Sequence, residues 1–461
     1  MNANALETRA NLASAGASLD DRYLEFSERC QPVFAAYPEL ESLRHYLFRE
    51  LWVRGRRETW KQWAKHWLRP VWRGSRTRGP LERADVMFWF EDRGRTRGTD
   101  MMLPVSTELA SRGGRVSLVG PPRPPGGPVP AVAFRFSARA RPPTWGRHAW
   151  DALCQTGEEL RRPALTRAFY HACAMVQALL EEMSRVLEAI QPRVAVLLST
   201  QLAGGAGLVT VARTRGTCTL LLQHGILQPF YLPVLADRML TWGPASNDTL
   251  LGLGVPAEKL VALGSPGHDR MAPSRDGRAR AAFLESLGLP DRPTLVFFSN
   301  GNDLLRNGNA PLECARWLGS VAAAFAHAVN VVVRLHPNED GGIYHRWPAL
   351  RITKGAPDLA TTLEGCDCVA SLCSTVLHEA LLYDKPVWQF HADGWPTLAA
   401  CWEQGLAVRV SSSTDLMTML GGLGRGTAGV GTGRLADFVF VNRGRATQAV
   451  ADYIEALIAE A

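Results

Sequence analysis

The chain has 461 residues, a formal net charge of +7 and 46% hydrophobic residues. This length is too great for a single hydrophobic core and fits two domains with extensions. The ordinary composition excludes a largely disordered protein, and no run approaches the roughly 18 consecutive apolar residues of a membrane-spanning helix. The first residues, MNANALETRANLASAG, lack the basic start and apolar core of a secretory signal, so we expect a cytoplasmic location.

The nine cysteines are odd in number and scattered along the chain. This distribution favours reduced thiols over a disulfide framework. Cys366, Cys368 and Cys373 lie close together, but their spacing matches no common zinc pattern. We therefore interpret them as small buried side chains.

Residues 1–80 are predicted to form a helical, basic, Trp-rich extension. Helical spacing between residues 24 and 51 indicates one buried face. Its candidate core positions are Phe26, Phe34, Leu40, Leu43 and Leu47.

The segment 49–79 contains ten Lys or Arg residues, and Trp60, Trp63 and Trp67 share one face of its predicted helix. An aromatic face beside a basic face is typical of a helix at an anionic membrane, which predicts peripheral contact with the inner membrane. The alternative is a Trp face packed on the protein with solvated Lys and Arg outside. No nucleic-acid-binding motif accompanies the charge, so nucleic acid is not expected as a partner.

From residue 84 onward, short apolar runs alternate with helical segments, as in a parallel sheet covered by helices. The pattern occurs twice, which predicts an α/β protein with two Rossmann-like domains facing a cleft. Residues 84–270 form the predicted N-terminal domain and 280–445 the predicted C-terminal domain. A C-terminal helix is expected over 446–461.

Polar residues follow several predicted strands of the second domain. His336 and Pro337 come directly after NVVVRL, and Ser374 and Thr375 precede a helix expected to begin near Val376. Ligands of open α/β sheets bind at these carboxyl ends, and a helix N-terminus with hydroxyl groups attracts a phosphate. The alternatives are that His-Pro only ends a strand and that Ser-Thr is an ordinary helix cap.

Four further residues complete the predicted donor site. Asn300 and Gly301 belong to the loop Ser299-Asn300-Gly301-Asn302 that follows a predicted strand, and glycine permits close approach of backbone to a phosphate or sugar. Arg334 supplies a cationic group beside His336. Glu379, one turn into the helix after Thr375, is a candidate acceptor for ribose hydroxyls.

The candidate bases lie in the first domain. Glu91 and Asp92 follow its first strand, and His224 follows the strand TCTLLLQ. A histidine needs little pKa shift to act near neutral pH, whereas a carboxylate must be desolvated or oriented. We favour Asp92, and the choice among the three residues stays open.

The motifs LLQHGI, ADRMLTWG, VRLHPNED and SLCSTVLHEALLYDKPV resemble, in this order, bacterial surface- and capsule-polysaccharide glycosyltransferases of the two-domain GT-B fold. The likeness covers about residues 84–440 and extends to Kdo transferases, sialyltransferases and CDP-glycerol glycerophosphotransferases. It implies that the N-terminal domain (84–270) holds the acceptor and the C-terminal domain (280–445) the nucleotide donor. It also implies that His336-Pro337 contacts the donor nucleotide and Ser374-Thr375 its phosphate. It also implies a base in the string beginning Glu91-Asp92, which departs from the family pattern by an extra Arg93, and a catalytic role for His224-Gly225.

The resemblance implies an inverting glycosyltransferase that moves a sugar, expected to be an acidic sugar linked to CMP, to a surface glycan or lipid-linked acceptor. Alternatives are a CDP-polyol phosphotransferase, a nucleotide-sugar 2-epimerase and a non-catalytic nucleotide- or glycan-binding protein. No Asp-x-Asp motif stands where a nucleotide would bind. We therefore expect catalysis without a metal and no cofactor beyond the nucleotide-sugar co-substrate.

Overall fold

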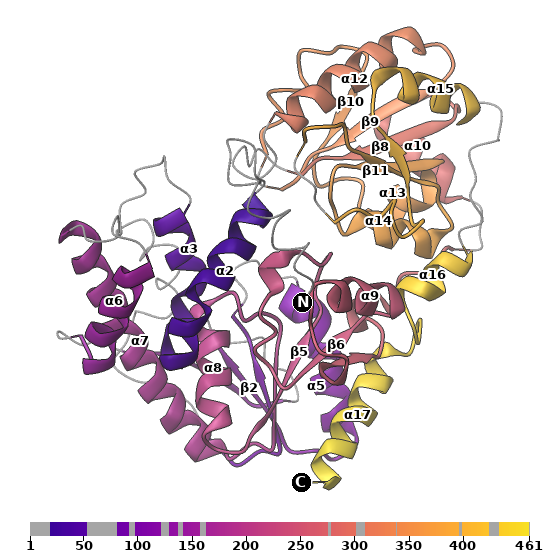
Figure 1. Ribbon diagram of the computed structural model, residues 1–461. Helices are drawn as coiled ribbons and strands as arrows, with labels where there is room; N and C mark the ends of the chain where they lie inside the picture. Colours follow the sequence, from indigo (N-terminus) through magenta and orange to yellow (C-terminus); the bar gives the residue numbers. More distant parts are fainter. Residues whose placement is uncertain are drawn as a thin grey trace. The chain divides into compact units, whose positions relative to one another are not determined.

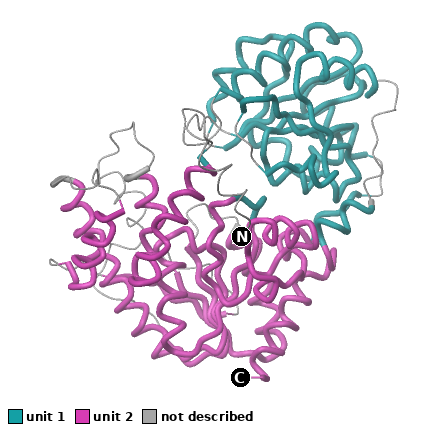
Figure 2. The backbone as a smooth tube through the Cα atoms, viewed as in Figure 1, with its two compact units in different colours: residues 1–19, 225–228, 270–440 teal, residues 20–224, 229–269, 441–461 magenta. Residues whose placement is uncertain are grey.

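The computed structural model describes residues 19–52, 81–91, 97–120, 129–136, 142–156, 163–274, 278–300, 309–337, 339–395, 399–423 and 433–460. The chain forms two compact units, coloured separately in Figure 2. The first unit consists of residues 20–224, 229–269 and 441–461. The second unit consists of residues 270–440, with the short segment 225–228 and residues 1–19.

The first unit is built on a sheet of seven parallel strands in the order β3-β2-β1-β4-β5-β6-β7. All of its strand pairings are parallel, so each connection between paired strands has to return to the same end of the sheet. The strands are β1 (Val86–Trp89), β2 (Val116–Gly120), β3 (Ala131–Ala133), β4 (Val194–Leu197), β5 (Cys218–Leu222), β6 (Arg238–Thr241) and β7 (Leu260–Ala262).

Helices α5 (Arg97–Ser111) and α17 (Ala446–Glu460) belong to this first unit and lie side by side in Figure 1. Val450 and Ile454 of α17 are buried in one core with Val86 and Phe88 of β1. The end of the chain therefore returns to complete the core of the first sheet. The unit also contains α6 (Thr144–Thr156), α7 (Pro163–Ile190), α8 (Ala203–Arg213) and α9 (Pro244–Gly252).

The N-terminal extension begins with helices that pack into the first unit. They are α2 (Leu19–Ala36), a 3₁₀ segment η2 (Pro38–Leu43) and α3 (Arg44–Trp52). All five predicted core positions are buried: Phe26, Phe34, Leu40, Leu43 and Leu47 are at most 1% exposed. The predicted interfacial helix falls largely within residues 53–80, outside the described residues.

The second unit is built on six parallel strands in the order β10-β9-β8-β11-β12-β13. They are β8 (Thr294–Phe298), β9 (Asn330–Arg334), β10 (Arg351–Thr353), β11 (Cys368–Ser371), β12 (Val387–Phe390) and β13 (Val408–Val410). Counted from its own first strand, this order is 3-2-1-4-5-6, that of a dinucleotide-binding fold, and the first sheet begins in the same way. The predicted pair of Rossmann-like domains is therefore confirmed.

The helices of the second unit are α10 (Ala279–Leu287), α12 (Ala310–Ala324), α13 (Leu359–Gly365), α14 (Val376–Glu379), α15 (Ser413–Leu423) and α16 (Gly433–Val439). α12 and α15 contribute Leu318 and Leu416 to a core with Phe297, Val333 and Phe390 of the strands. The near-continuous apolar strands are explained by this cover, since both faces of a parallel sheet are buried.

Among the described residues, no helix is long and apolar enough to cross a bilayer, and no group of three or more His, Cys, Asp or Glu side chains is arranged to hold a metal ion. Cys366, Cys368 and Cys373 are buried free thiols, as predicted.

Candidate functional site

The order of the second sheet reverses between β8 and β11, which lie side by side although β9 and β10 come between them in sequence. Ligands of doubly wound folds bind outside the carboxyl ends of the strands at such a point. Continuing the observed pairing two residues past Phe298 brings Asn300 level with His336 on one side and Cys373 on the other. His336, Asn300 and the turn that begins after Cys373 therefore share one edge of one sheet.

His336 and the turn containing Ser374 and Thr375 lie on either side of the end of β8. Neighbouring strands are about 4.8 Å apart, so the backbones of His336 and Cys373 are separated by about 10 Å. His336 is exposed, and Ser374 and Thr375 are half-buried. The three side chains are thus accessible at one edge of the sheet. His336 is too far from Ser374 and Thr375 for all three to contact a single phosphate.

The end of β8 is hydrogen-bonded to both neighbours. The backbone N–H of His336 donates to Ser299 Oγ at 2.8 Å, and the Ser299 hydroxyl donates to the Glu339 carboxylate. The backbone N–H of Glu339 donates to the carbonyl of His336 at 2.9 Å, which closes the turn. Glu339 is 2% exposed, so a buried carboxylate holds the Ser299 hydroxyl, which in turn accepts the backbone N–H of His336.

Asn300 makes the corresponding contacts on the other side. Its Oδ1 accepts from the backbone N–H of Cys373 at 3.2 Å and lies 2.9 Å from the Ser371 hydroxyl. Its Nδ2 donates to the carbonyl of Cys373. The Asn300 amide therefore pairs with Cys373 as a further residue of β8 would.

Ser374 and Thr375 have different environments. Ser374 Oγ lies 3.4 Å from the backbone N–H of Val376, as in an ordinary turn at a helix start. Thr375 makes no such bond; its Oγ1 lies 3.4 Å from the backbone N–H of Ile226, in the 225–228 segment of the second unit. Helix α14 begins at Val376, as predicted, but has four residues before the chain continues as 3₁₀ helix, so little helix dipole adds to the hydroxyl groups.

Two other predicted donor residues are placed as follows. Arg334 ends β9, and its guanidinium donates to the carbonyls of Pro357 and Gly355 and to Thr362 Oγ1. Burial lowers the pKa of Arg334, and these contacts bind it to the loop after β10. Glu379 is half-buried at the end of α14.

Pro337 is exposed beside His336, and Gly301 lies outside the described residues.

The same row contains a residue that the sequence interpretation missed. His391 follows β12 and is level with Cys373 when the pairing of Ser371 with Gln389 is continued. Burial and the nearby charge of Arg409 lower the pKa of His391. The signal was available, since His391 follows an apolar strand just as His336 does.

The candidate bases of the first unit have separate positions. Glu91 follows β1, and its carboxylate accepts the backbone N–H groups of Gly204 (2.9 Å) and Gly205 (2.7 Å) at the start of α8. It also accepts the indole N–H of Trp89 at 3.1 Å. A Cβ on Gly204 would lie 2.6 Å from the Glu91 carboxylate, which explains the glycine. The carboxylate of Glu91 thus fills the anion-binding helix start at the reversal point of the first sheet.

His224 follows β5 and is half-buried, with its ring nitrogens 3.5 Å from the Tyr231 hydroxyl. Asp92 lies outside the described residues.

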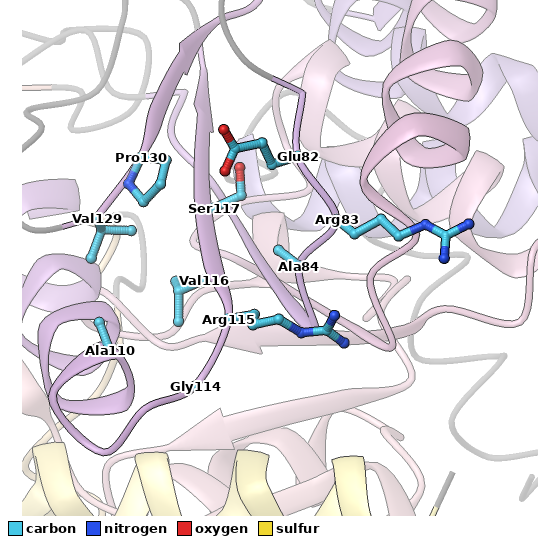
Figure 3. A pocket seen from close by; sticks show the side chains of 10 residues that line it. All are labelled: Glu82, Arg83, Ala84, Ala110, Gly114, Arg115, Val116, Ser117, Val129 and Pro130. Carbon is cyan, nitrogen blue, oxygen red and sulfur yellow. The ribbon is translucent and has the colours of Figure 1, made fainter.

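A cavity of about 330 Å³ opens at the amino ends of β1, β2 and β3, the end of the sheet opposite to His224 (Figure 3). Glu82, Arg83, Arg115 and Ser117 contribute its polar lining. Arg115 is already paired with Asp85 at 2.6 Å. This cavity is therefore separate from the strand ends at which ligands of parallel sheets bind.

No protein-family model and no curated protein matches the sequence. Solved structures do match the fold. A Listeria monocytogenes protein assigned provisionally as a UDP-N-acetylglucosamine 2-epimerase is 13% identical, with a TM-score of 0.53 over 82% of this chain and 98% of its own. The UDP-GlcNAc 2-epimerase of Neisseria meningitidis bound to UDP-GlcNAc is 13% identical, with a TM-score of 0.51 over 80% of this chain and 99% of its own.

The Methanocaldococcus jannaschii UDP-GlcNAc 2-epimerase in complex with UDP-GlcNAc and UDP is 10% identical, with a TM-score of 0.51 over 80% of this chain and 99% of its own. These likenesses extend over both units. The chain has the two-domain GT-B fold.

Proposed function

We propose that this chain is an enzyme acting on a nucleotide-activated sugar, whose phosphates bind at the carboxyl ends of β9, β8 and β11. The observation that carries the proposal is the alignment of His336 and the Ser374-Thr375 turn at the reversal point of the second sheet. An imidazole and two hydroxyl groups can donate hydrogen bonds to a diphosphate as negative charge develops on it.

The proposal that the phosphates bind in the second unit is supported by the corresponding position of the first unit, which already holds a carboxylate. Each sheet has one reversal point, and the helix start at that of the first sheet is filled by Glu91. A second anion there would be repelled by this carboxylate. The carboxyl edge of the second sheet has no such internal anion contacting the Ser374-Thr375 turn among the hydrogen bonds of the described residues.

The reaction that the fold likeness supports best is epimerisation at C2 of the sugar. The C2 proton has no adjacent carbonyl group to make it acidic, so direct exchange is unfavourable. A base can instead remove this proton while the C1–O bond breaks and its electron pair leaves with the nucleoside diphosphate. Return of a proton to the opposite face of C2 and re-addition of the diphosphate at C1 then give the epimer, without an acceptor.

For the base we propose His224 or Asp92. Glu91 is less suited because its oxygens already accept three hydrogen bonds from Trp89, Gly204 and Gly205. The ring nitrogens of His224 lie 3.5 Å from the Tyr231 hydroxyl, a neutral group. In general, an imidazole can accept a proton near neutral pH, as a base for this reaction must.

The second candidate is transfer of the sugar to an acceptor hydroxyl, with inversion at C1. It is favoured by the sequence order of LLQHGI, VRLHPNED and SLCSTVLHEALLYDKPV, which resembles that of surface-carbohydrate transferases. Both reactions begin with departure of the same nucleotide, so the donor site described above serves either. They differ in whether an acceptor is required.

The test is incubation of the purified full chain with UDP-GlcNAc and no acceptor, in deuterated water, followed by proton NMR. The epimerase proposal predicts the C2 epimer and incorporation of deuterium at C2. If the nucleotide sugar is consumed only when a glycan acceptor is added, the epimerase proposal is wrong and the transferase proposal replaces it. Thermal-shift measurements with UDP, CMP, CDP and GDP accompany the assay, and no stabilisation by any nucleotide would overturn the proposal as a whole.

A further inference from the structure

Asn300 stands where the predicted donor site would place a ligand-binding side chain, yet its polar atoms are engaged within the protein. Its Oδ1 accepts from Cys373 N–H and lies 2.9 Å from the Ser371 hydroxyl, and its Nδ2 donates to the Cys373 carbonyl. An amide has one acceptor oxygen and two N–H groups, so three of its contacts are already made. Little capacity is left for a nucleotide.

These contacts determine the conformation of the turn that follows β11. The last residue of β11 is Ser371, and no neighbouring strand pairs with Cys373 beyond it in the described part of the sheet. Cys373 is 7% exposed, so its peptide groups have little access to water. Without Asn300, both peptide groups would lose these hydrogen bonds, and the backbone just before Ser374 would be held less firmly.

A second side-chain amide, that of Gln389, contacts the same turn from the neighbouring strand β12. Gln389 in β12 is fully buried, and its Nε2 donates to the carbonyl of Leu372 at 2.8 Å. Its Oε1 accepts the backbone N–H of Cys401 at 2.9 Å. The residues before Ser374 are therefore held by two side-chain amides, that of Asn300 after β8 and that of Gln389 in β12. Asn300 contacts Cys373, and Gln389 contacts Leu372.

We propose that Asn300 is a positioning residue, which aligns the Ser374-Thr375 hydroxyl groups with the donor phosphates and does not itself bind the donor. This inference rests on the proposed nucleotide site. It predicts that the effect of removing Asn300 on binding is exerted through the hydroxyl groups of the turn. If so, the energetic effects of Asn300 and Ser374 on binding are coupled and not additive.

The experiment is a double-mutant cycle on nucleotide affinity, measured by calorimetry with UDP, or with whichever nucleotide stabilises the wild type. Asn300→Ala and Ser374→Ala are each expected to raise Kd by about 10-fold, equivalent to about 1.4 kcal/mol. The double variant is expected to raise Kd by about 10-fold as well, because the misplaced turn has already lost the hydroxyl contact. A direct contact from Asn300 would multiply the two effects to about 100-fold and overturn the proposal.

The matched control is Asn330→Ala. Asn330 is another asparagine of the second unit whose amide is engaged within the protein: its Nδ2 donates to Pro290 O (2.9 Å) and lies 3.0 Å from Thr294 Oγ1, at the amino end of the strands. Its loss is expected to lower the melting temperature as Asn300→Ala does, while Kd stays within twofold of wild type. Equal loss of affinity in both variants would show a general loss of stability and refute a positioning role for Asn300.

The outcomes separate this inference from the proposed function. If the wild type binds no nucleotide, the proposed function fails. If the wild type binds and Asn300→Ala leaves Kd unchanged, the nucleotide site stands and the inference on Asn300 fails. Normal affinity in Asn300→Asp would also refute the inference, because a carboxylate lacks the N–H donor to the Cys373 carbonyl.

Discussion

Single residues in the first unit show how burial changes acid–base behaviour. The His45 ring is stacked on Tyr23, with ring centroids 5.1 Å apart. Burial, assisted by the positive charge of Arg44, lowers the pKa of His45 to about 3. The folded protein therefore holds His45 neutral at a pH where an exposed histidine is charged.

This pKa predicts a defined pH dependence of stability. Below pH 6.5, the unfolded chain binds a proton at His45 that the folded chain excludes, so stability falls as pH falls from 6.5 towards 3. The contribution is about 1.4 kcal/mol per pH unit, and it is absent above pH 6.5. Urea unfolding of the wild type and His45→Gln at pH 7.5, 6.5, 5.5 and 4.5 measures it.

The two proteins are expected to differ by a constant free energy of unfolding between pH 7.5 and 6.5. At pH 4.5 the wild type should have lost about 2–3 kcal/mol more than His45→Gln. Parallel stability curves over the whole range would show that His45 is not held neutral by the fold.

At the scale of secondary-structure elements, the start of α8 depends on Glu91. The carboxylate accepts from Gly204 and Gly205, two of the backbone N–H groups that a helix leaves without partners at its first turn. Removing an acceptor of this kind costs about 0.5–2 kcal/mol, and loss of the negative charge at the helix start adds to it. Glu91 therefore connects β1 to α8 across the reversal point of the sheet.

We predict that Glu91→Ala lowers the free energy of unfolding by about 2–3 kcal/mol, measured by urea denaturation. Glu82→Ala is the control, because Glu82 is exposed and precedes the same strand; its effect should stay within about 0.5 kcal/mol. A Glu91→Gln variant that keeps full stability and loses all turnover would instead identify Glu91 as the catalytic base.

The element scale also shows what the sequence could reveal. Apolar runs such as ADVMFWF and TLVFFSN predicted buried strands correctly, because parallel strands covered on both faces must be apolar throughout. The stretch 24–51 was recognised by its helical spacing, and the structure divides it into α2, a 3₁₀ segment that begins at Pro38, and α3. A proline alone did not reveal this division, because Pro32 lies inside α2 without ending it.

The site was predictable only in part. The position of His336 and Ser374 at strand ends followed from local patterns and from the geometry of parallel sheets. The hydrogen bonds between Asn300 and Cys373 join residues 73 positions apart, and the hydrogen bond from Gly204 N–H to the Glu91 carboxylate joins residues 113 positions apart. No local pattern encodes such contacts, because an asparagine after a strand is equally suited to bind a ligand or a backbone.

At the scale of the whole molecule, the two units have the same strand order and different chemistry at their reversal points. In the first unit an internal carboxylate occupies the start of α8. In the second unit, the buried side chains of Ser299 and Glu339 and the half-buried side chain of Asn300 instead support two groups that can face a ligand, the His336 turn and the Ser374-Thr375 turn. This asymmetry supports the proposed nucleotide site in the second unit.

The central claim is tested most directly by nucleotide titration calorimetry of His336→Ala beside His327→Ala. Both histidines are exposed and flank β9, with His336 at its carboxyl end and His327 before its amino end. We predict that His336→Ala raises Kd at least 10-fold at unchanged melting temperature, while His327→Ala binds as the wild type does. Wild-type affinity in His336→Ala, or an equal loss in both variants, would contradict a nucleotide site at the carboxyl edge of the second sheet.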